Sequence, residues 1–130
     1  MDNHHIKLFV VDGNIVYIHH SANHPNDDDP GPHLRAPKDD KVRFKAPKDG
    51  GFRIEFDTES PFVSGAGRPG FPIVSNDGSQ TPLEILKPIG TVTKSFKYSV
   101  QIAGLDDDPE IIIDNSGGGG GGGPKKKRKK

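Results

Sequence analysis

Strict two-residue alternation in three stretches restricts this chain to a fold built from β-strands. Residues 41–45, "KVRFK", and residues 52–56, "FRIEF", have an apolar side chain at every second position. Residues 94–102, "KSFKYSVQI", continue the pattern with aromatic and β-branched side chains. Successive side chains of a strand point to opposite faces, so this alternation is typical of a strand with one buried face. We therefore expect these stretches to supply the core of a sheet structure.

Turn signals separate the predicted strands. Asp12-Gly13 stands between apolar runs in "LFVVDGNIVYI" and predicts a tight hairpin. Twelve prolines and 17 glycines favour turns, and no window of about eleven residues has helical periodicity. Further short strands and loops are expected as follows: strands at 73–75, 83–86 and 111–113, a polar loop at 21–32, and a Gly/Pro-rich loop at 57–72. The pattern predicts an all-β fold, a Greek-key β-sandwich of about seven to nine strands.

The end of the chain differs sharply in composition from the rest. Residues 117–123 are all glycine, Pro124 follows, and residues 125–130 are all Lys or Arg. We expect residues 1–116 to form the β-sandwich domain and residues 117–130 to form a disordered linker and basic tail. The chain has 18 cations and 18 acids, but 6 of the cations lie in the tail. Residues 1–124 therefore contain 12 cations against 18 acids, a net charge of −6.

Composition also limits the chemistry and the compartment. The chain has no cysteine, which excludes disulfides, thiol catalysis and thiolate metal sites. The N-terminal apolar run, residues 8–11, is too short for a signal-peptide core or a membrane span. We expect a soluble, intracellular monomer without a membrane span. With the basic tail, the expected location is nuclear in a eukaryotic host and cytoplasmic otherwise.

Two segments resemble cupredoxin-like domains. Residues 33–56, "HLRAPKDDKVRFKAPKDGGFRIEF", are similar to the family's strand–turn–strand segment, with Pro-Lys-Asp-Asp in place of the usual Pro-Gly-Asp turn. Residues 90–104, "GTVTKSFKYSVQIAG", and 109–114, "PEIIID", are similar to its last two strands, between which the copper loop lies. Together they cover about two-thirds of the predicted domain. The resemblance implies a Greek-key sandwich.

The chain departs from that family at the copper ligands. The family binds copper through two His, one Cys and usually one Met. Phe52 stands about where the first His is expected, and Val100 about where the Cys is expected. The following loop, residues 103–110, "AGLDDDPE", has neither His nor Met. We therefore expect the fold without the copper site and without any other cofactor, and a fold alone does not define a function.

A His- and Asp-rich stretch, residues 19–33, is an alternative metal site. The candidate ligands are His19, His24, His33 and Asp27. Imidazoles and carboxylates suit Zn²⁺ or Cu²⁺ if the loop folds inward. Adjacent His19 and His20 point to opposite faces of a continuing strand, which favours adventitious affinity over a built site. A shared calcium site between residues 27–29 and 106–108 stays a further alternative.

Catalytic motifs are not found. The sequence has no Gly-x-Ser-x-Gly elbow and no His-Glu-x-x-His. Residues 65–70, "GAGRPG", match G-x-G-x-x-G, but no strand–helix unit surrounds them, so a loop with Arg68 near an anion is the better interpretation. We expect a protein that is not an enzyme and that acts as an interaction or structural module with an unidentified protein partner.

The tail gives the most direct indication of a partner. Its cations are Lys125, Lys126, Lys127, Arg128, Lys129 and Lys130. This cluster resembles the basic signals that nuclear import receptors bind, and an added localisation tag has the same appearance. The alternative is direct association with nucleic acid or another anionic surface, where six phosphate contacts on duplex DNA give a log–log salt slope of about −5. Because residues 1–124 are acidic, we expect such binding to be non-specific and confined to the tail.

Overall fold

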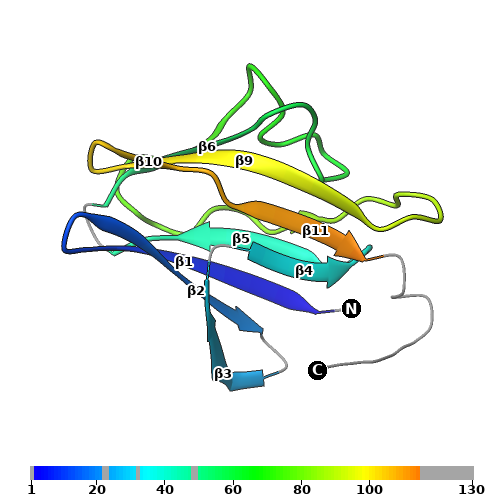
Figure 1. Cartoon of the computed structure of the whole chain (residues 1–130), viewed down its shortest axis with the longest axis horizontal. Helices are drawn as coiled ribbons and strands as arrows, with labels where there is room; N and C mark the ends of the chain where they lie inside the picture. The colour runs from blue at the N-terminus through cyan, green and yellow to red at the C-terminus, as the bar shows by residue number, and fades with distance from the viewer. Residues whose placement is uncertain (1, 22–23, 32, 48–49, 115–130) are drawn as a thin grey trace.

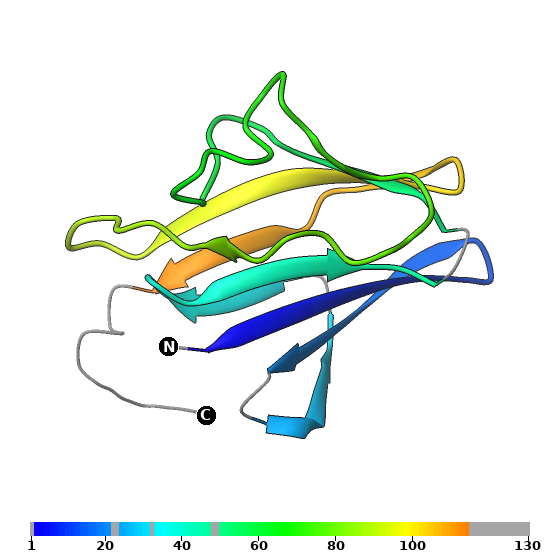
Figure 2. The same cartoon turned by 180° about the vertical axis from the view of Figure 1, so that it is seen from behind.

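The protein is a sandwich of two β-sheets. The structure is a computed structural model that describes residues 2–21, 24–31, 33–47 and 50–114, with only the backbone described for 24–30. Every regular element in these ranges is a strand, and the strands form two layers (Figure 1; Figure 2 shows the opposite side). The predicted all-β fold is confirmed. The predicted linker and tail, 117–130, lie outside the described residues, as do residues 115–116 of the predicted domain.

The first sheet has the order β3-β2-β1-β5-β8. Its strands are β1 (Asn3–Val11), β2 (Asn14–Ser21), β3 (His24–Pro30), β5 (Lys41–Lys45) and β8 (Glu84–Ile85). β1 pairs antiparallel with β2 and parallel with β5. The β1–β2 turn is the predicted hairpin, with φ of 52° at Asp12 and 78° at Gly13. Positive φ at both central residues matches the right-handed twist of the flanking strands.

The second sheet has the order β4-β11-β9-β6-β7, and β10 pairs with the far end of β9. Its strands are β4 (His33–Pro37), β6 (Phe52–Phe56), β7 (Ile73–Ser75), β9 (Lys94–Ile102), β10 (Leu105–Asp107) and β11 (Glu110–Asp114). β11 pairs parallel with β4 and antiparallel with β9. The chain passes repeatedly between the sheets, from β3 to β4, back to β5, and on to β6. These crossings are typical of the predicted Greek-key sandwich.

The predicted polar loop 21–32 is wrong in its middle part. Residues 24–30 form β3, which pairs antiparallel with β2 across an irregularity at His20/Ser21. The proline and aspartate content of this stretch predicts a turn, but pairing with an exposed strand edge satisfies its backbone groups and prevails over local preference. Residues 105–107 likewise form the added strand β10 by pairing back onto β9. None of the described segments forms a helix that is long and apolar enough to cross a bilayer.

The core lies between the sheets and is built from the alternating apolar positions. Tyr98 is 1% exposed, and its ring contacts Phe44 at 5.9 Å and Phe56 at 4.9 Å between centroids. Phe56 also meets Phe62 edge-on, at 5.7 Å and 90°. Each such aromatic pair contributes about 0.5–1.5 kcal/mol beyond its buried area. The predicted alternation on β5, β6 and β9 thus gives one continuous core that joins both sheets.

Candidate functional site

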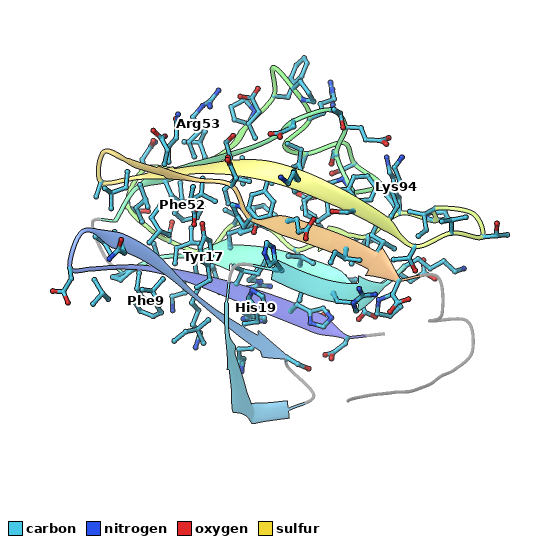
Figure 3. All side chains as sticks on the ribbon, viewed as in Figure 1. Phe9, Tyr17, His19, Phe52, Arg53 and Lys94 are labelled. Atoms are coloured by element: carbon cyan, nitrogen blue, oxygen red, sulfur yellow. The ribbon has the colours of Figure 1, made fainter. Side chains whose placement is uncertain are left out.

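The two residues that the resemblance places at copper-ligand positions, Phe52 and Val100, lie inside this core. Phe52 on β6 is 3% exposed and Val100 on β9 is fully buried. The two strands are neighbours, with Ile54 opposite Val100 and Phe52 opposite Ile102. Figure 3 shows Phe52 directed into the space between the layers. Neither a phenyl ring nor an isopropyl group has a metal-donor atom, so these residues do not fit the His, Cys and Met set that copper requires.

The predicted His/Asp metal residues are distributed over both sheets. His19 lies on β2, is buried, and is directed between the layers (Figure 3). His33 lies on β4 in the other sheet, is exposed, and has its Nδ1 at 3.6 Å from Glu110 Oε1. His24 and Asp27 belong to β3, where only the backbone is described. Among the described side chains, the metal-ligand group that lies within reach of one ion includes neither His19 nor His33.

That group consists of Asp2, His4 and Asp40, whose ligand atoms all lie within 4.8 Å of one another. His4 Nε2 is 2.7 Å from Asp40 Oδ2, and the Asp2 backbone N–H donates to Asp40 Oδ1 at 3.1 Å. The Ser21 hydroxyl donates to the Asp2 carboxylate. One imidazole and two carboxylates suit a borderline cation such as Zn²⁺. The hydrogen bonds already present equally suit a clamp that fixes the start of β1.

The parallel pairing of β1 with β5 explains why these three residues meet. Asn3 is in register with Lys41, and the Lys41 N–H donates to the Asp2 carbonyl at 2.8 Å. This pairing places the first residues of β1 beside Asp40, which ends the β4–β5 turn. Sequence reasoning missed the cluster because His4 and Asp40 are far apart in the chain, and no local spacing connects them. The partial signal was the isolated acidic pair Asp39-Asp40 directly before a strand.

The G-x-G-x-x-G segment forms a series of tight turns with no helix after it. Gly65, Gly67 and Gly70 all have positive φ, from 80° to 88°. The Arg68 and Phe71 N–H groups each donate to a carbonyl three residues earlier, which closes consecutive turns. The Arg68 guanidinium lies 3.8 Å from the centre of the Phe71 ring. Without a helix N-terminus, the segment lacks the N–H array that a dinucleotide phosphate requires.

The chain resembles solved structures in its backbone, whereas comparison with family models and with curated proteins finds no match. No protein-family model matches it, and no curated protein matches it. The crystal structure of McoA multicopper oxidase 2F4 variant from the hyperthermophile Aquifex aeolicus aligns with a TM-score of 0.43 at 15% identity. The alignment covers 86% of this chain and 26% of that chain. The chain thus spans about a quarter of the length of that oxidase.

Proposed function

We propose that the protein is a copper-free, cupredoxin-like β-sandwich that acts without catalysis, as an interaction or structural module. The observation that supports this most is the identity and burial of Phe52 and Val100, which stand at the expected ligand positions. Tight apolar packing there leaves no donor atoms for an electron-transfer metal. The proposed module is a monomer that contacts an unidentified protein partner through the loops at one end of the sandwich.

Metal reconstitution tests the proposal. The purified chain is stripped with a chelator, incubated with Cu²⁺, desalted, and measured for bound copper and visible absorption. We expect no intense blue absorption band and no oxidase activity. A His4→Ala variant serves as the control for copper held at the N-terminus, because it removes the imidazole of the Asp2–His4–Asp40 cluster. A tight blue Cu(II) centre, or a catalytic activity that survives chelation, would overturn the proposal.

A second candidate function is association of the basic tail, Lys125 to Lys130, with polyanions or with a nuclear import receptor. The six consecutive cations after a glycine linker favour it. The test compares the native chain with one in which all six residues are serine. Duplex DNA binding by the native chain should weaken about thirtyfold for each doubling of salt, and the serine tail should abolish it. In eukaryotic cells, a fluorescent fusion should lose nuclear accumulation with the same change.

A further inference from the structure

The outward face of the first sheet collects cations from three strands. Arg43 on β5 is in register with His5 on β1, which is in register with His20 on β2. One step along the strands, Lys45 is in register with Lys7. These side chains share a face because partners in register project to the same side, opposite the buried Ile6, Leu8, Val42 and Phe44. We call Lys7, Lys41, Arg43, Lys45, His5 and His20 the basic face.

The lysines and arginine of the basic face are not neutralised by neighbouring carboxylates. Among the described residues, none of Lys7, Lys41, Arg43 and Lys45 forms an ion pair, and the buried Nε of Arg43 has no hydrogen-bond partner. Burial lowers the pKa of His5, and the nearby positive groups of Arg43, His20 and Lys7 lower it further. This is expected where positive charge is concentrated. Among the described side chains, these four cations therefore have no carboxylate partner.

Most cations of the second sheet and its adjoining loops, by contrast, have a carboxylate partner. Arg53 binds Glu55 at 3.0 Å, Arg35 binds Asp114 at 3.2 Å, and Lys94 and Lys87 both bind Glu59. Arg53 and Lys94 lie on this upper layer in Figure 3. Residues 1–124 have an excess of acids, so a face that gathers three lysines and an arginine within them is a segregation of charge and not a reflection of composition.

A hollow with an aromatic side chain adjoins the basic face. It has a volume of about 270 Å³ and is lined by Lys7, Phe9, Lys45, Ala46 and Pro47. Phe9 is half-buried on the outward side of β1, away from the other sheet (Figure 3). Two lysine side chains and the Phe9 ring therefore share the lining of this hollow. A flat aromatic ring can stack on Phe9 while an attached anion contacts the lysines.

We propose that the basic face binds single-stranded nucleic acid, with one base in the Phe9 hollow and backbone phosphates along Lys7, Lys41, Arg43 and Lys45. Alternate residues of a strand are about 6.6–6.8 Å apart, so Lys41, Arg43 and Lys45 form a line of cations along β5. A recessed aromatic beside such a line accepts an unstacked base, which a single strand exposes and a duplex does not. This surface is distinct from the tail.

The test uses the full chain with Lys125 to Lys130 changed to serine, so that tail binding cannot contribute. Anisotropy of a short labelled oligothymidylate measures the affinity at several salt concentrations. Four phosphate contacts predict a log–log salt slope of about −2.8, a roughly sevenfold loss of affinity for each doubling of salt. Failure of this chain to bind would overturn the basic-face proposal and leave the tail proposal intact.

Two variants and a matched control locate the contacts. Lys7→Ser with Lys45→Ser should reduce the slope to about −1.4 and weaken binding about 25-fold at about 0.1 M salt. Phe9→Leu keeps the apolar volume, and should weaken binding about fivefold or more while leaving the slope unchanged. Lys97→Ser with Arg68→Ser removes the same charge from the other side of the molecule and should have little effect.

Three results would contradict the assignment. One is an equal loss of affinity in the control and in the Lys7/Lys45 variant. Another is that Phe9→Leu binds oligothymidylate with unchanged affinity while the Lys7/Lys45 variant keeps an unchanged log–log salt slope. The third is tighter retention on phosphatidylserine vesicles than on oligothymidylate, which would assign the face to membranes. Near-ultraviolet circular dichroism of each variant confirms that the fold is intact.

Discussion

The two buried tyrosines differ in what their hydroxyl groups contact. Tyr17 Oη donates to Asp107 Oδ2 at 2.9 Å, whereas Tyr98 Oη has no hydrogen-bond partner among the described residues. Burial raises the pKa of both phenols, and the Asp107 carboxylate adds to the effect. Both hydroxyls stay protonated, so they differ in hydrogen bonding and not in charge. Figure 3 shows Tyr17 directed between the layers, where such a difference affects stability.

Removing each hydroxyl should change stability in opposite directions. Tyr98→Phe deletes an unsatisfied buried group and should raise the free energy of unfolding by about 1 kcal/mol. Tyr17→Phe leaves Asp107 without its donor and should lower the free energy of unfolding by about 1.5 kcal/mol. Urea unfolding followed by circular dichroism measures both changes. A loss of stability in Tyr98→Phe would show that its hydroxyl has a partner.

At the scale of elements, one glycine determines how the 76–79 turn meets the end of β5. Gly78 has φ of 86°, and its carbonyl accepts the Ala46 N–H at 2.9 Å. A Cβ on Gly78 would lie 2.2 Å from the Pro47 carbonyl oxygen. Gly90 has nearly the same φ, 84°, but a Cβ there would meet nothing within 4 Å. Substitutions at Gly78 and Gly90 can therefore be compared to separate the cost of backbone strain from the cost of steric overlap.

Alanine substitutions at these positions should therefore differ in cost. Gly90→Ala introduces only the left-handed backbone strain and should lower the free energy of unfolding by about 1 kcal/mol. Gly78→Ala adds a backbone clash and should cost at least about 3 kcal/mol in total. Thermal unfolding of both variants checks this. Equal costs would mean that the Ala46–Gly78 contact relaxes without penalty.

Local patterns predict the elements that depend on local information. The alternation in 41–45, 52–56 and 94–102 predicts β5, β6 and much of the core, because burial of one face imposes a period of two. The Asp12-Gly13 hairpin follows from backbone preference alone. β3 could not be predicted in this way. Its proline- and aspartate-rich sequence forms a strand because the free edge of β2 lies beside it.

The candidate site residues depend on register between distant segments, and most of them were not predictable. The basic face and the Asp2–His4–Asp40 cluster both result from the parallel pairing of β1 with β5. Counting charges over residues 1–124 predicts an acidic body, and it cannot show on which face the cations lie. The expectation that Phe52 and Val100 stand at copper-ligand positions stays a prediction, because it depends only on residue identity within a segment that resembles the family.

The whole molecule is assembled from contacts between segments that are far apart in sequence. β1 pairs with β5, and β4 pairs with β11, in each case in parallel. Two parallel strands cannot be joined by a tight turn, so a long segment of chain lies between them. The entropy of closing that segment is lost before the strand pairing can stabilise the fold. Sandwiches with such non-local contacts fold slowly for their size. Both sheets of this protein therefore depend on long-range encounters.

We expect refolding from urea to take milliseconds to seconds. The chain has no tryptophan, so the fluorescence of Tyr17 and Tyr98 is the probe in a stopped-flow experiment. Ile111→Ala, in the fully buried part of β11, should lower the free energy of unfolding by about 2–5 kcal/mol. Refolding within microseconds would contradict the proposed dependence on distant strands, since that rate is typical of local contacts.

The position of β11 between β4 and β9 has a consequence while the protein is being made. β4 leaves the ribosome early, yet its partner is translated only after β5, β6, β7, β8, β9 and β10. Until then the hydrogen-bonding edges of β4 and β9 that pair with β11 remain open to chaperones and to other nascent chains. A message truncated before Glu110 would therefore yield a substrate for proteolysis and not a smaller working module.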